Sequence, residues 1–180
     1  MSRVVFRPAI FLDRDGTLIH DFGYIRDWRQ VKLLSGVGET LRQIQQHGYL
    51  LVVISNQSGI GRGSITAGEA QWVHERTVEL LRDCGVRLDG VYFCPHVPDD
   101  HCACRKPAPG LLLQAARELK IDLARSIMIG DKSSDVQTGK AAGCRTLLFG
   151  PGDLPDASAL ADHSAGSWFD IADWVLRDED

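Results

Sequence analysis

The feature of this sequence that most constrains its fold is a regular alternation of short apolar runs with longer amphipathic segments. The apolar runs end near Gly, Pro, Asp or Asn, and runs of this length between such residues are typical of buried parallel strands. Five strands are therefore predicted, at residues 9–12, 49–54, 91–93, 127–129 and 146–149.

The segments between these runs carry apolar residues at three- and four-residue spacing, which predicts amphipathic helices. Strand and helix in alternation predict an α/β fold with a doubly wound, Rossmann-like parallel sheet. In such sheets, ligands bind at the carboxyl ends of the strands. The predicted helices lie at residues 37–46, 69–82, 110–119 and 135–142, and a closing helix at 168–176 follows an exposed loop at 150–166.

The chain of 180 residues has the length of one domain, so we expect a single domain over residues 1–180. The longest apolar run, residues 49–54, is far too short to span a membrane, and no early segment has the character of a signal peptide. We therefore expect a cytoplasmic protein with no membrane partner. A net charge of −4 argues against a nucleic-acid partner but permits a small anion at one site. Nothing in the sequence demands more than a monomer.

Two carboxylates, Asp13 and Asp15, directly follow the first predicted strand. Carboxylates this close together repel each other unless a cation lies beside them, and their hard oxygens favour Mg²⁺. The alternative is a surface turn, because Asp15 is followed by Gly16 and Asp-Gly pairs are common in turns.

Polar side chains also follow the second and fourth predicted strands. Ser55, Asn56 and Gln57 offer neutral donors that can bind phosphoryl oxygens, although an ST or Asx turn explains them equally well. The fourth strand leads to Asp131, Lys132 and Asp135, and Asp135 also suits the N-cap of the next helix. Each of these signals is ambiguous when it is taken alone.

A cluster of cysteine and histidine residues lies between residues 94 and 104, directly ahead of Arg105 and Lys106. In a reducing compartment, clustered cysteines indicate a metal rather than disulfides. Four protein ligands suit a tetrahedral Zn²⁺ with no open position, so we predict a structural zinc that fixes the two cations over the site. Unligated buried thiols are the alternative, and His101 is an alternative ligand. The predicted zinc ligands are Cys94, His96, Cys102 and Cys104.

An acidic pair, a hydroxyl donor, a lysine and a second acidic pair, each after a strand and in this order, resemble the motifs of the haloacid dehalogenase superfamily of phosphotransferases. The resemblance covers residues 9–150, and the ordered set is more specific than any one motif. It implies that Asp13 is the nucleophile that forms an aspartyl-phosphate, and that Asp15 is the general acid and base. It also implies that Ser55 holds phosphoryl oxygens and that Lys106 neutralises the charge shared by phosphate and nucleophile.

The same resemblance implies how the metal is held. The side chains of Asp13 and Asp131 and the main-chain carbonyl of Asp15 would bind Mg²⁺, and Asp135 would support the metal directly or through water. The connection after Asp15 is too short for a large cap domain, so we expect an uncapped haloacid dehalogenase fold with a zinc-binding loop.

Within the superfamily, the uncapped site and the zinc loop resemble the branch that contains heptose 1,7-bisphosphate 7-phosphatases and histidinol-phosphate phosphatases. Three segments resemble the heptose enzymes and favour a heptose bisphosphate as the substrate: residues 20–25, 55–63 and 130–132. Such a substrate belongs to nucleotide-heptose biosynthesis for bacterial lipopolysaccharide. The short zinc loop favours histidinol phosphate, which stays the alternative. A bisphosphate needs cations beyond those at the reacting phosphate. We expect the substrate contacts to come from Asn56, Arg62, Arg105 and Lys132.

Three rival classes explain less of the sequence. A zinc module that binds protein or nucleic acid accounts for residues 94–104 but leaves the carboxylates after the strands unexplained. A receiver-like domain shares the sheet and a phosphorylated aspartate, but it has no need of an acid and base at Asp15. A polynucleotide phosphatase should present a basic groove, which is not expected from a net charge of −4. Mg²⁺-dependent phosphate release from a small substrate, with none from DNA ends, separates these classes from the expected one.

Overall fold

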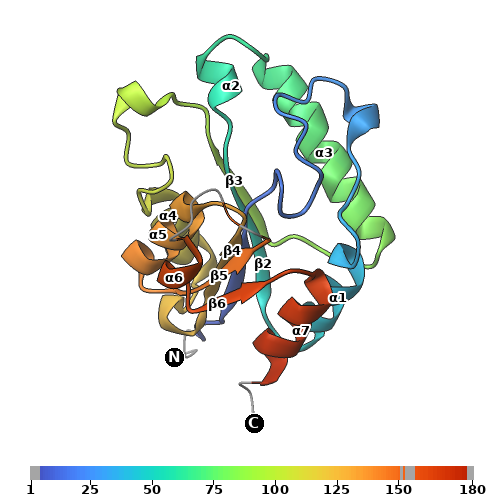
Figure 1. The fold of residues 1–180 in the computed structure, drawn as a ribbon, viewed down its shortest axis with the longest axis vertical. Helices are drawn as coiled ribbons and strands as arrows, with labels where there is room; N and C mark the ends of the chain where they lie inside the picture. The colour runs from blue at the N-terminus through green and yellow to red at the C-terminus, as the bar shows by residue number, and fades with distance from the viewer. Residues whose placement is uncertain (1–4, 151, 153–156, 178–180) are drawn as a thin grey trace.

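Six strands of the described residues pair in parallel in one sheet, in the order β3-β2-β1-β4-β5-β6 (Figure 1). The structure is a computed structural model that describes residues 5–150, 152 and 157–177; the other residues of the predicted domain lie outside the described residues. Five of the strands confirm those predicted from the apolar runs. The strands are β1 Ala9–Leu12, β2 Leu50–Asn56, β3 Gly90–Cys94, β4 Ile127–Gly130, β5 Arg145–Phe149 and β6 His163–Ala165.

The sixth strand corrects the prediction of an exposed loop at residues 150–166. β6 pairs with β5, with Ala165 opposite Phe149, and Ala165 is buried. The short helix α6, Ala157–Leu160, precedes it. A strand of three residues has no apolar run to mark it, so its pairing with β5 decides its conformation rather than its composition. Residues 151 and 153–156 of this stretch lie outside the described residues.

The predicted amphipathic helices are confirmed, and two of them begin earlier than predicted. The helix α3 begins at Ala67 because Thr66 caps it: Thr66 Oγ1 accepts a hydrogen bond from the Glu69 backbone at 3.1 Å. No helix in the described part of the chain has the length and apolar character needed to cross a membrane. The longer helices are α1 Val37–Gln46, α3 Ala67–Asp83, α4 Gly110–Leu119, α5 Ser133–Ala142 and α7 Trp168–Arg177; the short ones are α2 Ser58–Gly61 and the 3-10 helices η1 Trp28–Gln30, η2 Pro98–Asp100 and η3 Leu123–Arg125.

The side chains of β1 alternate between two cores, because successive residues of a strand point to opposite faces of the sheet. Ile10 and Leu12 pack with residues of α1, α3 and α7. Ala9 and Phe11 pack with residues of α4 on the other face. All four side chains are fully buried, which is why this strand reads as an uninterrupted apolar run.

The strand order reverses direction between β1 and β4, the two central neighbours. From β1 the chain continues to β2 and β3 on one side, and β4, β5 and β6 lie on the other. In this register Leu12 lies beside Ile129, and the Asp13 backbone donates to the Ile129 carbonyl at 2.9 Å. The residues that follow β1 and β4 therefore lie together, at the place where open α/β sheets bind ligands.

Candidate active site

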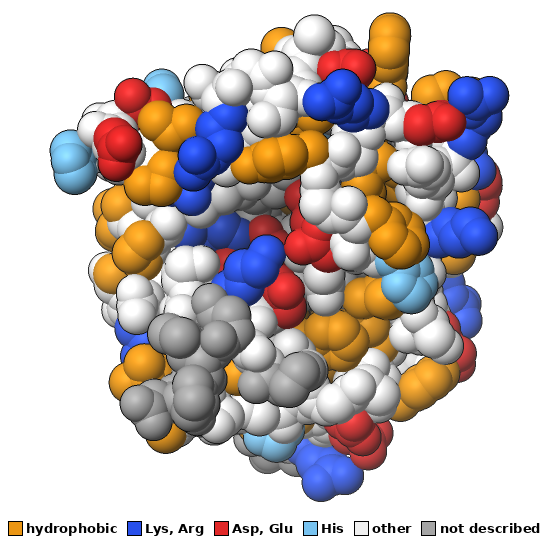
Figure 2. All heavy atoms as spheres, turned by 45° about the horizontal axis from the view of Figure 1, so that its top comes forward, with side chains coloured by type: hydrophobic (Ala, Val, Ile, Leu, Met, Phe, Trp, Pro, Cys, Tyr) orange, Lys and Arg blue, Asp and Glu red, His pale blue; other side chains and the backbone are white. Residues whose placement is uncertain are grey.

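A pocket of about 290 Å³ opens at the carboxyl ends of β1, β2 and β4. Figure 2 shows a hollow in this face in which acidic and basic side chains lie close together. Several residues predicted from the motifs meet there although they are far apart in the sequence. Its polar lining includes Asp13, Arg14, Asp15, Asp21, Asn56, Gln57, Arg105, Lys106, Lys132 and Asp135.

A second hollow, of about 520 Å³, lies away from the strand ends, between residues 26–29 and α3. Although it is larger, four of its charged groups form ion pairs at the surface: Arg29 lies 2.9 Å from Asp27, and Arg76 lies 3.1 Å from Glu79. It gathers no set of buried, convergent polar groups of the kind that marks a catalytic site. The smaller pocket is therefore the candidate active site.

Three carboxylates from two strand ends form a compact acidic group. Asp13 follows β1, and Asp131 and Asp135 follow β4; one oxygen of each lies within 4.8 Å of those of the other two. Asp135 is 1% exposed and lies in the first turn of α5, where its Oδ2 accepts a hydrogen bond from the Lys132 backbone at 3.0 Å. The helix N-terminus thus fixes this carboxylate and favours its negative charge.

Gly16 allows Asp131 to enter the group. Its φ of +83° belongs to the left-handed region, and a Cβ at this position would lie 2.5 Å from Asp131 Oδ2. Any side chain at residue 16 would therefore strain the turn and displace the carboxylate. The sequence analysis offered a turn as the alternative to an acidic site. Both are present, because the turn at Gly16 makes room for the carboxylate of Asp131.

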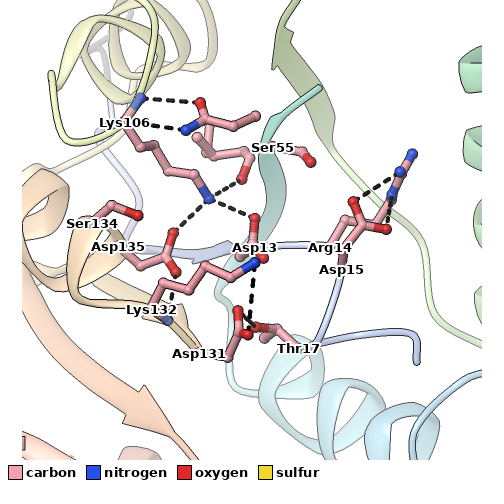
Figure 3. Close-up of polar contacts among 12 residues, drawn as sticks. Asp13, Arg14, Asp15, Thr17, Ser55, Lys106, Asp131, Lys132, Ser134 and Asp135 are labelled. Atoms are coloured by element: carbon pink, nitrogen blue, oxygen red, sulfur yellow. Dashed lines mark hydrogen bonds and ion pairs between the residues drawn. The ribbon is translucent and has the colours of Figure 1, made fainter. Parts of the chain in front are cut away.

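Lys106 is the cation that lies inside the acidic group (Figure 3). Its Nζ is 2.5 Å from an oxygen of Asp13 and 2.5 Å from Oδ1 of Asp135, and it donates to the Ile54 carbonyl at 3.1 Å. Burial lowers the pKa of Lys106, but the charges of Asp13 and Asp135 outweigh burial and raise the pKa overall. Lys106 is therefore a permanent cation beside the nucleophile that the motifs predict.

Lys106 and Lys132, whose Nζ lies 4.0 Å from Asp131, do not balance three carboxylates. Burial, together with the negative charges of Asp135 and Asp15, raises the pKa of Asp13 to about 7, although Lys106 opposes the rise. Burial, with a contribution from Asp135, also raises the pKa of Asp131, although Lys132 opposes the rise. The buried Oδ1 of Asp135 accepts no hydrogen bond and has only the ion pair with Lys106. An all-oxygen donor set with excess negative charge fits a hard divalent cation such as Mg²⁺.

Asn56 positions Lys106. Its side-chain Oδ1 accepts from the Lys106 backbone N–H at 3.1 Å, and its Nδ2 donates to the Lys106 carbonyl at 3.1 Å. The amide thus bonds to both backbone groups of Lys106. These bonds fix the chain that follows the zinc loop, residues 94–104, against β2. We predicted Asn56 as a substrate contact, and Asn56 does line the pocket. Its two bonds to Lys106 give it a structural role there, which is to place the lysine.

The sequence analysis missed Arg14, and it predicted Gln57 as a neutral donor without its contact to Asp15. Both are buried, and both hydrogen bond to the carboxylate of Asp15. A signal was available for Arg14, since an arginine that follows a buried strand needs an anionic partner. Nothing in the sequence indicates the direction of the Gln57 side chain.

The other predicted contacts differ in their position. Arg105 and Lys132 line the pocket, and Lys132 Nζ lies 3.6 Å from Asp21 and 4.0 Å from Asp131. Arg62 is the exposed C-cap of α2 and is not among the residues that line the pocket. Ser55 is 3% exposed, and its Oγ accepts from Gln57 at 2.8 Å.

The four predicted zinc ligands lie together in space. The sulfurs of Cys94, Cys102 and Cys104 are 3.1–3.5 Å apart, and His96 Nδ1 lies 3.2 Å from Cys104 Sγ. Burial raises the pKa of the Cys94 thiol to about 12, so a cation is needed to hold it as a thiolate. Three sulfurs and one imidazole nitrogen are the donor set that zinc prefers, and this cluster could hold a zinc ion. His101 is not among the four.

The zinc loop contacts the elements on either side of the pocket. The Cys94 carbonyl accepts from the Gln57 backbone at 2.7 Å, and the Pro95 carbonyl accepts from Gly61 in α2 at 3.0 Å. The Ala103 carbonyl accepts from Gly110, the first residue of α4, at 3.0 Å. Since the loop also continues directly into Arg105 and Lys106, its conformation controls where both cations lie.

Loss of the zinc ligands should therefore destabilise the protein. We expect Cys102→Ser to remove bound zinc and to cost about 2–4 kcal/mol, the effect of opening a cross-linked loop of similar length. That cost corresponds to a fall in melting temperature of roughly 5–15 °C for a domain of this size. Metal analysis and thermal melting check both, with Cys84→Ser as a matched control because Cys84 is exposed and outside the cluster. Unchanged zinc content in Cys102→Ser would contradict the assignment of this ligand.

Comparisons with known proteins agree on one family. The HAD-hydrolase-like family model matches residues 103–171. A D-glycero-beta-D-manno-heptose-1,7-bisphosphate 7-phosphatase from Yersinia pestis is 43% identical over 178 residues, which cover 94% of this chain and 90% of the relative. The Helicobacter pylori phosphatase of the same name is 48% identical over 147 residues, 81% of this chain and 84% of the relative. The crystal structure of a D,D-heptose 1,7-bisphosphate phosphatase from B. bronchiseptica, complexed with magnesium and phosphate, superposes with a TM-score of 0.85 at 28% identity and covers 96% of this chain and 99% of that one.

Proposed function

The chain belongs to the haloacid dehalogenase-like phosphatases, and we propose from this membership that it removes the 7-phosphate of D-glycero-β-D-manno-heptose 1,7-bisphosphate. The chain is a phosphoric monoester hydrolase; the substrate, the order of the chemical steps and the residue roles are the proposal. The product, heptose 1-phosphate, would supply nucleotide-heptose biosynthesis. The β anomer is taken from the names of the relatives that are about 40% identical along almost the whole chain.

The observation that carries the proposed chemistry is the meeting of Asp13, Lys106 and Asp135 at the floor of the pocket. A carboxylate held beside a permanent cation is poised to approach a phosphate, because the cation offsets the repulsion between the two anions. Burial also limits the water around Asp13, which strengthens its interactions with charged groups.

In the first step, a carboxylate oxygen of Asp13 forms a bond to phosphorus while the bond from phosphorus to the sugar O7 breaks. Asp15 gives its proton to O7, so that the sugar leaves as an alcohol. Ser55 donates its hydroxyl hydrogen to a phosphoryl oxygen, and Lys106 stabilises the charge shared by Asp13 and the phosphoryl group. The enzyme is left as an aspartyl-phosphate on Asp13 with Asp15 ionised.

In the second step, water attacks phosphorus and the bond to Asp13 breaks. Asp15 accepts a proton from the attacking water, which restores its starting protonation state and releases orthophosphate. Mg²⁺, when bound by Asp13, Asp131 and the main-chain carbonyl of Asp15 with Asp135 in support, would screen negative charge on the phosphoryl group. The B. bronchiseptica structure with magnesium and phosphate supports the choice of this metal.

The second phosphate of the substrate requires cations away from Asp13. Arg105 and Lys132 line the pocket, so we assign the 1-phosphate to these two side chains. The proposal does not depend on Arg62, because this residue is not among those that line the pocket.

The experiment that tests the proposed substrate compares Mg²⁺-dependent phosphate release from both anomers of heptose 1,7-bisphosphate with release from histidinol phosphate. We expect kcat/KM for the β-bisphosphate to exceed that for histidinol phosphate at least about a hundredfold, or about 2.7 kcal/mol of transition-state binding. Asp13→Asn serves as the blank for contaminating phosphatases. A preference for histidinol phosphate would replace the proposed substrate, and equal rates with the two anomers would remove the anomer assignment.

A further inference from the structure

Gln57 is a buried amide after β2 whose side chain contacts two residues of the active site. Its Nε2 lies 2.8 Å from Asp15 Oδ2 and 2.8 Å from Ser55 Oγ, and the residue is 7% exposed. Both bonds are donated by the amide nitrogen, with Asp15 Oδ2 and Ser55 Oγ as the acceptors. One NH₂ group therefore donates its two hydrogens to two different residues.

The bond to Ser55 orients the serine hydroxyl. Because Ser55 Oγ accepts a hydrogen bond from Gln57, its own hydrogen is directed elsewhere and can be donated to a phosphoryl oxygen. A hydroxyl without this partner could rotate and turn its lone pairs toward the phosphate. Gln57 thus selects the orientation in which Ser55 is a donor.

The bond to Asp15 completes a set of three donors to one carboxylate. Arg14 donates from Nε to Asp15 Oδ1 at 3.1 Å and from Nη2 to Oδ2 at 2.9 Å, and Gln57 supplies the third bond. Arg14 is 6% exposed, so its pairing with Asp15 is shielded from water. Figure 3 shows the Asp15 carboxylate turned toward Arg14 and away from Lys106 and Asp135. The carboxylate is held at one side of the nucleophile.

The backbone of Gln57 is itself fixed by the zinc loop. Its N–H donates to the Cys94 carbonyl at 2.7 Å, and Cys94 is one of the four clustered zinc ligands. Gln57 is also the N-cap of α2, whose Gly61 is bonded to Pro95 of the same loop. The position of the Gln57 side chain therefore depends on tertiary contacts on two sides.

We propose that Gln57 is a positioning residue that sets the Ser55 hydroxyl and the Asp15 carboxylate in one geometry, so that phosphoryl binding and proton transfer to the leaving group are aligned together. The proposal rests on the proposed function, which makes Ser55 the phosphoryl donor and Asp15 the acid. Gln57 acts through these two residues and needs no contact of its own with the reacting atoms.

The test uses two phosphate monoesters that differ in their need for an acid. An alkyl phosphate such as the heptose bisphosphate needs a proton on its leaving oxygen, whereas p-nitrophenyl phosphate releases a stabilised anion. For both, kcat/KM reports the steps up to formation of the aspartyl-phosphate. We expect Gln57→Met to lower kcat/KM about a hundredfold for the alkyl phosphate and no more than about tenfold for the aryl phosphate.

Further variants separate positioning from packing. Glu is closer to Gln in shape than Met is, so a packing role predicts that Gln57→Glu is the milder change. The positioning role predicts the opposite, because Glu brings a second carboxylate to Asp15 and donates nothing. In the Asp15→Asn background, Gln57→Met should no longer change the ratio of alkyl to aryl kcat/KM, since the residue through which it acts on that ratio is gone. Gln71→Met, on the exposed face of α3, is the matched control and should behave as the wild type.

Melting temperatures establish that each variant is folded before its kinetics are compared. An unchanged alkyl-to-aryl ratio in both folded Gln57 variants would overturn the proposal, as would full activity in Gln57→Glu. Turnover that survives in Asp13→Asn would instead reject the proposed function. Loss of turnover in Asp13→Asn with an unchanged ratio in the Gln57 variants would reject only the role of Gln57.

Discussion

Replacement of Asp13 by Asn should lower Mg²⁺-dependent phosphate release by at least about four orders of magnitude and leave the fold intact. Asn has no carboxylate oxygen to attack phosphorus, so no aspartyl-phosphate can form. The amide oxygen of Asn can still accept the hydrogen bond that Lys106 now donates to Asp13 at 2.5 Å. The change also removes one of three crowded negative charges, so the stability of the metal-free protein should not fall.

Three measurements check this result together. Steady-state phosphate release gives the loss of activity, thermal melting without metal gives the stability, and rapid acid quenching during turnover tests for phosphate covalently retained on the protein. The wild type should retain phosphate and Asp13→Asn should not. Asp99→Asn, an exposed position in η2, is the matched control and should match the wild type in all three. Covalent phosphate on the Asp13→Asn protein would place the nucleophile elsewhere.

Lys106→Met should have the second largest effect, on both activity and stability. Loss of the cation beside the nucleophile should lower kcat about 10²–10³-fold, as expected for one electrostatic group at a transition state. The fold should lose about 3–5 kcal/mol without metal, because Asp13 and Asp135 would be left buried without their shared partner. Met occupies a similar volume, so the loss reports charge rather than an empty cavity.

The stability of Lys106→Met should also depend on pH in a defined direction. The folded-state pKa of Asp13 is already raised to about 7 from its ordinary value of 3.8, and removal of Lys106 takes away the main influence that opposes the rise. A carboxyl group whose pKa is raised by folding makes the protein less stable as the pH rises from the unfolded-state pKa through the folded-state pKa. The variant should therefore be less stable relative to the wild type at pH 8 than at pH 6.

Denaturant unfolding of the metal-free proteins at the two pH values measures this difference. Added Mg²⁺ should recover part of the lost stability, since it supplies positive charge to the same carboxylates. Lys140→Met is the matched control: Lys140 pairs with Asp162 at 2.6 Å on the surface, where an ion pair is worth less than about 1 kcal/mol. Equal losses in the two variants, or a Lys106→Met protein that is more stable at pH 8, would contradict a buried charge role for Lys106.

The candidate active site shows how far strand-end residues predict the location of a site. Each motif has an ordinary local explanation, and the turn at Gly16 is present in the structure. Asp135 is not the N-cap that we predicted: α5 begins at Ser133 with Lys132 as its N-cap, and Asp135 accepts a hydrogen bond from the Lys132 backbone. The local roles and the site coincide because a turn or a helix N-terminus is what fixes a carboxylate in place. The order of the motifs along the chain was informative because parallel strands bring their carboxyl ends to one edge of the sheet.

The sequence by itself determined the α/β alternation and the candidate zinc ligands, because these depend on residue type and short spacing. The resemblance of its ordered motifs to a known family marked Asp13, Asp15 and Lys106 as candidate site residues and implied the candidate Mg²⁺ ligands. Tertiary structure alone decided that the Lys106 side chain lies between Asp13 and Asp135, that Arg62 is not among the pocket residues, and that β6 is a strand. It also decided the direction of Gln57, whose backbone bonds to Cys94 and whose side chain bonds to Asp15. The physical reason is that side-chain directions and edge pairing depend on contacts between segments distant in the chain, and such contacts leave no local pattern in the residues that make them.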